Sequence, residues 1–200
     1  MRNGCESKSK WPHSRASKTT IHHYFNTTTM TFLATDMVAC TEAGGRSISF
    51  VVKGSPAVQS RNIIAWKGRA RPILFDPSSS NKLNYRDAVR QEMKAVGLPA
   101  KNFFSDTTAI RMKVKFVLPR RRKDVILRPS PPHLAANALS FPRGKDVDNL
   151  LKFVMDALEQ TLYANDTNIV RVWVEKCYAT DLMESVGWTE LHFWKVVCID

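Results

Sequence analysis

The chain has few cysteines, and their positions favour neither a metal site nor a disulfide-stapled fold. Its four cysteines are scattered along 200 residues, at Cys5, Cys40, Cys177 and Cys198. No Cys-x-x-Cys pair or Cys/His spacing indicates a structural zinc ion, and no framework of closely spaced cysteines is present. We therefore expect an intracellular protein in a reducing compartment, with organellar and nuclear locations both open.

Long hydrophobic runs and acidic residues are also scarce. No apolar run approaches the 18 residues of a membrane-spanning helix, so we expect no membrane partner. The chain carries 30 Lys+Arg against 18 Asp+Glu, a formal net charge of +12. This charge favours a polyanionic partner, and nucleic acid fits better than a lipid surface because the clearest amphipathic segment is acidic on its polar side.

The chain does contain enough apolar residues for a core, since 44% are hydrophobic and 10% are aromatic. Its beginning is different: of the first 35 residues, 11 are Ser or Thr, five are Lys or Arg, and Glu6 is the only acid. This composition is typical of an organellar transit peptide, but a disordered tail or a start codon assigned too far upstream explains it equally well. We therefore predict a disordered or targeting tail over residues 1–46 and a folded domain over residues 47–200.

Charge is divided unevenly along this predicted domain. The segment from Lys53 to Arg128 has 18 basic and 5 acidic residues, whereas the segment from Lys145 to Asp200 has 5 basic and 10 acidic residues. A basic half can hold phosphate groups while a carboxylate-rich half binds a metal ion.

Hydrophobic periodicity predicts an α+β fold. Residues 110–118 alternate between apolar and basic side chains, which indicates a half-buried strand with a basic outer face. Residues 84–96 repeat apolar side chains at helical spacing, and Gly97 and Pro99 end this helix. Further strands are predicted at residues 47–52, 169–177 and 188–197. The expected architecture is a small mixed β-sheet packed with two main helices.

The second helix begins at residue 147 and presents charged residues on one side. Its apolar positions form a single arc, and Asp148 and Lys152, four residues apart, share the opposite side. Asp146 precedes the first turn, where its carboxylate can cap free backbone N–H groups. An ordinary structural role is also open, because acids in a first turn interact with the helix dipole and Asp/Lys pairs at this spacing are common on surfaces.

A third carboxylate, Asp166, lies between this helix and the predicted strand at 169–177. A strand packed beside the helix would bring Asp166 close to Asp146 and Asp148. Three converging carboxylates are the oxygen ligands that Mg²⁺ prefers, and Mn²⁺ can substitute for it. Such an ion activates water for phosphodiester hydrolysis, and Lys152 can offset the charge that develops in the transition state.

These residues also resemble a known family. The run KDVDNLLK at residues 145–152, the DAL at 156–158 and Asp166 before Ile169 are similar to the signature of the RusA-type Holliday junction resolvases. The similarity is dense over residues 145–176 and looser over 47–118. It implies a small α+β nuclease that acts as a homodimer with Mg²⁺, binds four-way DNA junctions and cuts symmetrically related strands.

The resemblance assigns roles residue by residue. The family's metal-binding acids fall on Asp146, Asp148 and Asp166, and its catalytic lysine falls on Lys152. Asp156 also matches a family position, and we interpret it as structural rather than catalytic.

The chain departs from the compact form of the family in one place. About twenty residues separate the arginine run at 120–123 from Asp146, so the position of this run relative to DNA stays open. Phosphate contacts orient a nucleic acid without reading its sequence, and basic residues supply them. The candidate DNA-binding residues are Arg61, Lys67, Arg69, Arg71, Arg120, Arg121, Arg122, Lys123 and Lys145.

Two other functions are compatible with the sequence. One is a catalytically silent junction-binding protein, which is disfavoured because phosphate binding alone would be stronger without the carboxylates. The other is a nuclease for flaps, replication forks or RNA-containing branches, which the same chemistry would serve. Cleavage assays on a panel of branched substrates would separate these functions.

Overall fold

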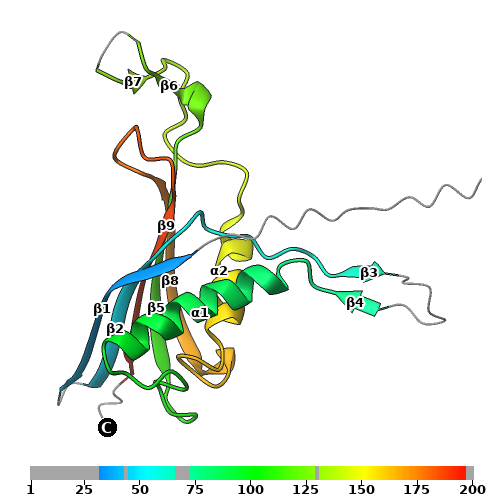
Figure 1. Cartoon of the computed structure of the whole chain (residues 1–200), viewed down its shortest axis with the longest axis vertical. Helices are drawn as coiled ribbons and strands as arrows, with labels where there is room; N and C mark the ends of the chain where they lie inside the picture. Colours follow the sequence, from blue (N-terminus) through cyan, green and yellow to red (C-terminus); the bar gives the residue numbers. More distant parts are fainter. Residues whose placement is uncertain (1–31, 43–44, 66–72, 129–130, 197–200) are drawn as a thin grey trace, which may run out of the picture.

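The structure is a computed structural model that describes residues 32–42, 45–65, 73–128 and 131–196. Five long strands form one mixed sheet: β1 (Leu33–Glu42), β2 (Gly45–Lys53), β5 (Ile110–Leu118), β8 (Ile169–Tyr178) and β9 (Trp188–Lys195). Their order in the sheet is β1-β2-β9-β5-β8 (Figure 1). The two α-helices of the described residues are α1 (Ser79–Ala95) and α2 (Val147–Leu158).

The sheet is antiparallel except at one edge. β1 pairs with β2, β2 with β9 and β9 with β5 in antiparallel register. β8 pairs with β5 in parallel, from Ile110 opposite Ile169 to Leu118 opposite Tyr178. A parallel pair needs a crossover connection, and α2 lies in the segment that links these two strands. β8 is therefore an edge strand with α2 as its neighbour in the chain.

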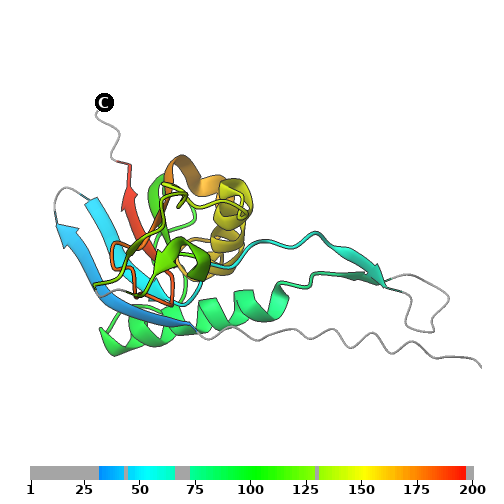
Figure 2. The ribbon, with the colours of Figure 1, turned by 90° about the horizontal axis from the view of Figure 1, so that it is seen from above.

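The core lies between the sheet and both helices, which pack on the same face (Figure 2). Alternation along the strands creates this face, as the fully buried Met112 and Val114 of β5 illustrate. Lys113, between them, points to the other face and is exposed. The helices contribute Tyr85, Val89 and Met93 from α1 and Leu150, Phe153, Val154, Ala157 and Leu158 from α2.

Contacts from α1 stabilise the C-terminal end of α2. The last carbonyl groups of a helix have no partners within that helix. Arg86 donates hydrogen bonds from Nε to the Ala157 carbonyl at 2.9 Å and from Nη2 to the Asp156 carbonyl at 3.0 Å. Its positive charge also complements the negative end of the helix dipole. The end of α2 is thus fixed against α1.

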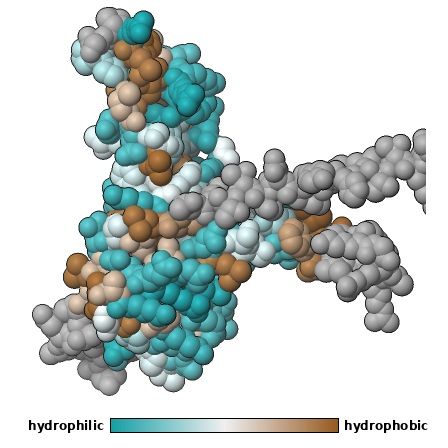
Figure 3. All heavy atoms as spheres, in the orientation of Figure 1, coloured by the Kyte–Doolittle hydropathy of each residue, from teal (hydrophilic) through white to brown (hydrophobic). Residues whose placement is uncertain are grey.

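Two hairpin arms extend away from the sheet and helices (Figure 1). One pairs β3 (Ile63–Ala65) with β4 (Ile73–Phe75), and the other pairs β6 (Val125–Ile126) with β7 (His133–Leu134). Both arms show apolar surface (Figure 3). The second arm is built from the segment that separates the arginine run from α2 in the sequence.

The predicted fold class, a mixed sheet with two helices, is confirmed, as are the predicted strands that became β2, β5, β8 and β9. The first helix starts at Ser79, earlier than predicted. None of the described helices has the length and apolar character needed to cross a membrane.

The described strands begin before the predicted domain boundary at residue 47. β1 covers residues 33–42, which were assigned to the tail, and it pairs with β2. An irregularity between Thr35 and Val38, with Asp36 at φ 56°, interrupts the alternation by which strands are recognised. Residues 1–31 lie outside the described part, so their disordered or targeting character stays a prediction.

Candidate active site

The first turn of α2 presents two carboxylates. Asp146 is the N-cap residue, and its main-chain oxygen accepts a hydrogen bond from the Leu150 amide at 3.1 Å. Its carboxylate does not cap the helix, and Asp148 is exposed two residues later. Neither carboxylate has a hydrogen-bond or ion-pair partner among the described residues. Two such acids repel each other unless a cation lies between them.

Lys145 fixes the position of this turn. Its Nζ donates to the Pro56 carbonyl and lies 3.4 Å from Ser55 Oγ, while Lys176 of β8 donates to the main-chain oxygen of Lys145. Burial lowers the pKa of Lys145. This candidate DNA contact therefore uses its amine inside the protein, where it ties the start of α2 to the loop that follows β2.

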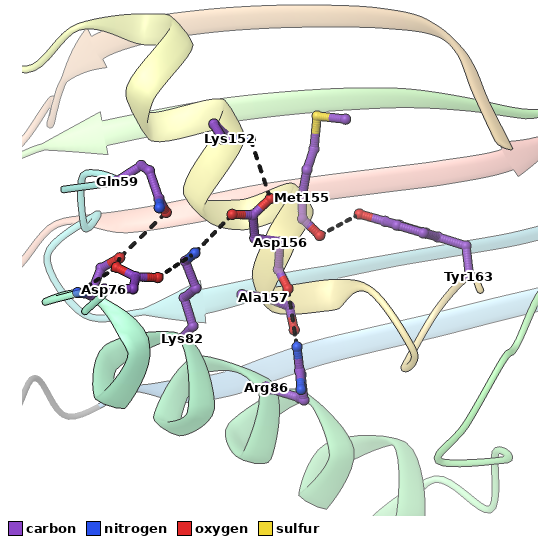
Figure 4. A network of polar contacts seen from close by, with 10 residues as sticks. Gln59, Asp76, Lys82, Arg86, Lys152, Met155, Asp156, Ala157 and Tyr163 are labelled. Carbon is purple, nitrogen blue, oxygen red and sulfur yellow. Dashed lines mark hydrogen bonds and ion pairs between the residues drawn. The ribbon is translucent and has the colours of Figure 1, made fainter. Parts of the chain in front are cut away.

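One turn farther along α2, Lys152 carries an amine that is open to solvent. Its side chain is 63% exposed, and Nζ lies 3.8 Å from Asp156 Oδ1. The other oxygen of Asp156 lies 2.7 Å from Nζ of Lys82, which also contacts Asp76 at 2.9 Å (Figure 4). α1 therefore anchors Asp156, and Asp156 is in place to orient Lys152. This arrangement favours a structural interpretation of Asp156.

The pKa values in this network follow from its geometry. Burial alone lowers the pKa of Lys82, but its interactions with Asp156 and Asp76 outweigh burial and raise it above the ordinary value. Burial alone raises the pKa of Asp76, but hydrogen bonds from Ser78 and Lys82 outweigh that and lower it. Lys82 and Asp76 are therefore both charged at neutral pH, and the network is held by ionic contacts.

The third predicted acid, Asp166, lies where the chain enters β8. It begins a 3₁₀ turn, Asp166–Asn168. Asn168 Nδ2 donates to the main-chain oxygens of Asp106 at 2.7 Å and Thr108 at 3.1 Å, both just before β5. Asp166 is therefore exposed at the end of the sheet where the parallel pair begins.

Asp146 and Asp148 lie at the opposite end of this parallel pair. Lys176, whose amine contacts the residue before Asp146, is seven residues into β8. At about 3.3 Å per residue, roughly 23 Å of strand separates it from the start of β8. The expectation that Asp166 joins the other two acids is therefore wrong within one copy of the chain, because α2 runs antiparallel to β8.

The donor set fits a divalent cation only in part. In the described part of the chain, no group of three His, Cys, Asp or Glu side chains is close enough to hold a metal ion. Mg²⁺, however, is commonly held by one or two carboxylates together with waters and substrate phosphates. Asp146 and Asp148 are unpaired oxygen donors with open surroundings, so they fit such an ion.

Comparison with known families identifies the class of protein. The family model of the endodeoxyribonuclease RusA matches residues 53–183, more than half of the chain. The chain belongs to the RusA family. The matched region contains both helices and all four predicted catalytic residues, whereas β1 and β9 lie outside it. Comparisons with curated proteins and with solved structures gave no match.

The basic residues predicted to bind DNA in this RusA-family chain occupy different surroundings. Arg61 is exposed just before the β3–β4 arm, and Arg122 and Lys123 are exposed at the base of the β6–β7 arm. These three are available for phosphate contacts. Three others lie outside the described residues: Lys67, Arg69 and Arg71.

Two arginines of the run at 120–123 make contacts within the protein. The guanidinium of Arg120 lies 4.5 Å from the centre of the Tyr178 ring and donates to the Leu139 carbonyl at 3.2 Å. Arg121 makes a bidentate pair with the buried Asp124, at 2.8 and 2.9 Å. These contacts fix the base of the β6–β7 arm.

The network around Lys82 was not found from the sequence. A local signal exists at its edge, since Asp76 is two residues before Ser78 and accepts a hydrogen bond from the Ser78 amide at 2.9 Å. The contact between Lys82 and Asp156 has no such signal, because 74 residues separate them.

Proposed function

We propose that this RusA-family chain is a Mg²⁺-dependent endodeoxyribonuclease that hydrolyses phosphodiester bonds in four-way DNA junctions during recombination and repair. The first turn of α2 carries the proposal. There Asp146 and Asp148 stay free of protein cations, and Lys152 presents an exposed amine one turn away. An acid pair in this state is suited to bind a metal ion beside a phosphate.

Each residue of this site has a separate task. Asp146 and Asp148 hold the metal ion, which when bound lowers the pKa of a water molecule and stabilises charge on the phosphate. Lys152 places a positive charge where it can contact a phosphate oxygen. Asp156 orients Lys152 from the side of α1.

A homodimer would explain the separate position of Asp166. β8 is an edge strand, and an edge strand pairs readily with another chain. If β8 of one copy pairs antiparallel with β8 of a second copy about a two-fold axis, the start of one β8 lies beside the end of the other β8. Asp166 of one copy then lies at the end of the sheet that carries Asp146 and Asp148 of the other copy. Two such sites suit a junction that has its own two-fold axis.

The first test is cleavage of a labelled four-way junction and of a linear duplex, with and without Mg²⁺. Asp148→Asn should abolish cleavage but retain junction binding, because it removes a metal ligand together with some repulsion of phosphate. Asp87→Asn is the matched control, since Asp87 is an exposed acid on α1, and it should cut like the wild type. Paired nicks in the junction alone, absent without Mg²⁺ and in Asp148→Asn, are the expected result.

Other outcomes would contradict specific parts of the proposal. Tight junction binding without cleavage in Mg²⁺ or Mn²⁺ would indicate a silent binding protein. Equal cutting of flaps or forks would remove the selectivity for four-way junctions. Mixing Asp148→Asn with Asp166→Asn tests the shared site, because a mixed dimer would keep one intact site and regain nicking. No recovery in mixtures that have exchanged subunits would reject the dimer arrangement.

A further inference from the structure

The face of the sheet turned away from α1 and α2 carries two stacked tryptophans. Trp173 of β8 and Trp194 of β9 flank β5, and their ring centres are 5.5 Å apart with planes inclined by 14°. Together with Lys113 and Glu175 they line a depression of about 460 Å³. Trp173 is still 42% exposed, so no described part of the chain seals this depression.

Three cations lie around these rings. The guanidinium of Arg171 is 5.6 Å from the centre of the Trp173 ring. Arg111 is in register with Trp194 on one side and with Arg171 on the other, and Lys113 is in register with Trp173. The aromatic surface is therefore bordered by positive charge on neighbouring strands.

Two acids of this face, Glu175 and Glu190, lie in the next row toward the C-terminal end of β5, and Asp36 of β1 lines a neighbouring depression with them. Lys115 is in register with both Glu175 and Glu190, and its amine lies 3.4 Å from Glu190. Glu190 also accepts a hydrogen bond from Trp188 Nε1 at 3.0 Å. These contacts offset part of the negative charge, which leaves the row around the stacked rings positive.

A partly exposed pair of stacked indole rings with cations beside it matches single-stranded nucleic acid. Every base has a face that stacks on an indole ring, and phosphates bind neighbouring Arg and Lys side chains. A second copy of the chain fits less well, because packing this face on itself about a two-fold axis would bring like cations together. The charge of the face therefore favours a polyanion.

We propose that this face is a second DNA-binding surface, which stacks unpaired bases on Trp173 and Trp194 and holds their phosphates with Arg111, Lys113 and Arg171. The inference rests on the proposed function only in taking the nucleic acid to be DNA. It adds a substrate feature, bases that become unpaired when the branch point of a junction is opened. It does not depend on cleavage.

The test measures binding without chemistry. Fluorescence anisotropy of a labelled oligothymidylate of about 12 nucleotides, and of a duplex of the same length, is followed in EDTA at several salt concentrations. Trp173→Ala should lower the affinity for the single strand about tenfold, and Trp173→Phe should lower it less because a ring remains. Arg171→Gln should also weaken binding and reduce the salt slope by about 0.7. Lys94→Gln, an exposed lysine on α1, is the matched control and should change nothing.

Circular dichroism melting of each variant checks that it is folded. Unchanged single-strand affinity in folded Trp173→Ala would overturn the inference. The inference would also be overturned if a variant bound the single strand normally but eluted from size-exclusion chromatography as a smaller species. This face would then be a contact between copies of the chain. Single-strand binding that depends on Trp173 in a protein that cuts no junction would support the inference while the proposed function fails. Junction cleavage together with single-strand binding that ignores Trp173 would reject the inference while the proposed function stands.

Discussion

The two halves of α2 carry the same acidic side chain in opposite surroundings. In the first turn, Asp148 is exposed and has no described partner. Two turns later, Asp156 is half-buried between Lys82 at 2.7 Å and Lys152 at 3.8 Å, and Arg86 holds its main-chain oxygen. The difference comes from α1, whose cations reach only the second half of α2.

This contrast separates a reactive acid from a structural one within a single helix. Removing one member of a partly buried ion pair leaves a charge without compensation, which destabilises the fold. Removing an exposed charge costs little stability. Substitutions in the two halves of α2 should therefore divide into effects on cleavage and effects on folding.

The largest expected effect is on the rate of junction cleavage, from a substitution at Lys152 in the middle of α2. Lys152→Ala should lower the single-turnover rate of junction cleavage by about 10²–10³-fold, because a positive charge beside the developing charge on the phosphate is lost. The free energy of unfolding should change by less than about 0.5 kcal/mol, since the side chain is 63% exposed. Stopped-flow or quench-flow kinetics and urea unfolding measure the two quantities.

Lys152→Arg is the matched variant, since it keeps the charge but changes its shape. It should retain part of the rate. If Lys152→Ala lowered the free energy of unfolding enough to explain its loss of activity, Lys152 would be a structural residue. The contrast between the two halves of α2 would then fail.

The next effect is on stability, in the second half of α2. Lys82→Met should lower the free energy of unfolding by about 2 kcal/mol, because Asp76 and Asp156 lose their common counter-charge. Lys94→Met, at an exposed position in the last turn of the same helix, is the control and should stay within about 0.5 kcal/mol of the wild type. Equal urea midpoints for the two variants would show that the network contributes nothing.

A smaller effect should link the two halves. Asp156→Asn removes the charge that orients Lys152, so the rate of junction cleavage should fall about tenfold through misplacement of the amine. Junction affinity in the absence of metal should stay the same, because the two carboxylate oxygens of Asp156 face the amines of Lys82 and Lys152. A rate equal to that of the wild type would mean that Lys152 is positioned without Asp156.

The sequence predicted the features of this site that depend on local periodicity. The alternation over residues 110–118 predicted β5 with its observed bounds, and the apolar arc from residue 147 predicted α2. The spacing of Asp148 and Lys152 follows from helix geometry alone. The family motif at residues 145–152 then assigned the chain to the family that comparison confirms.

Features that depend on long-range packing were missed or wrong. Asp166 was expected close to Asp146 because a strand packed beside the helix would bring it there, but β8 runs antiparallel to α2 and leaves the two acids at opposite ends. The partner of Asp156 comes from α1, and no spacing encodes a contact across 74 residues. A bulge at Asp36 hid β1 by interrupting its alternation.

The smallest expected effect is the response of the second half of α2 to acid. Because hydrogen bonds from Ser78 and Lys82 outweigh burial and lower the pKa of Asp76 below its ordinary value of 3.8, the unfolded chain takes up this proton first as the pH falls. The stability that Asp76 contributes is therefore complete above about pH 3.8 and is lost as the pH falls through the lower, folded value. In urea unfolding between about pH 5 and pH 3, Asp76→Asn should lose less stability than the wild type. If both proteins lost the same free energy of unfolding over this range, the ionic contact between Asp76 and Lys82 would not stabilise the end of α1 that anchors Asp156. The contrast between the two halves of α2 would then rest on Lys82 and Asp156 alone.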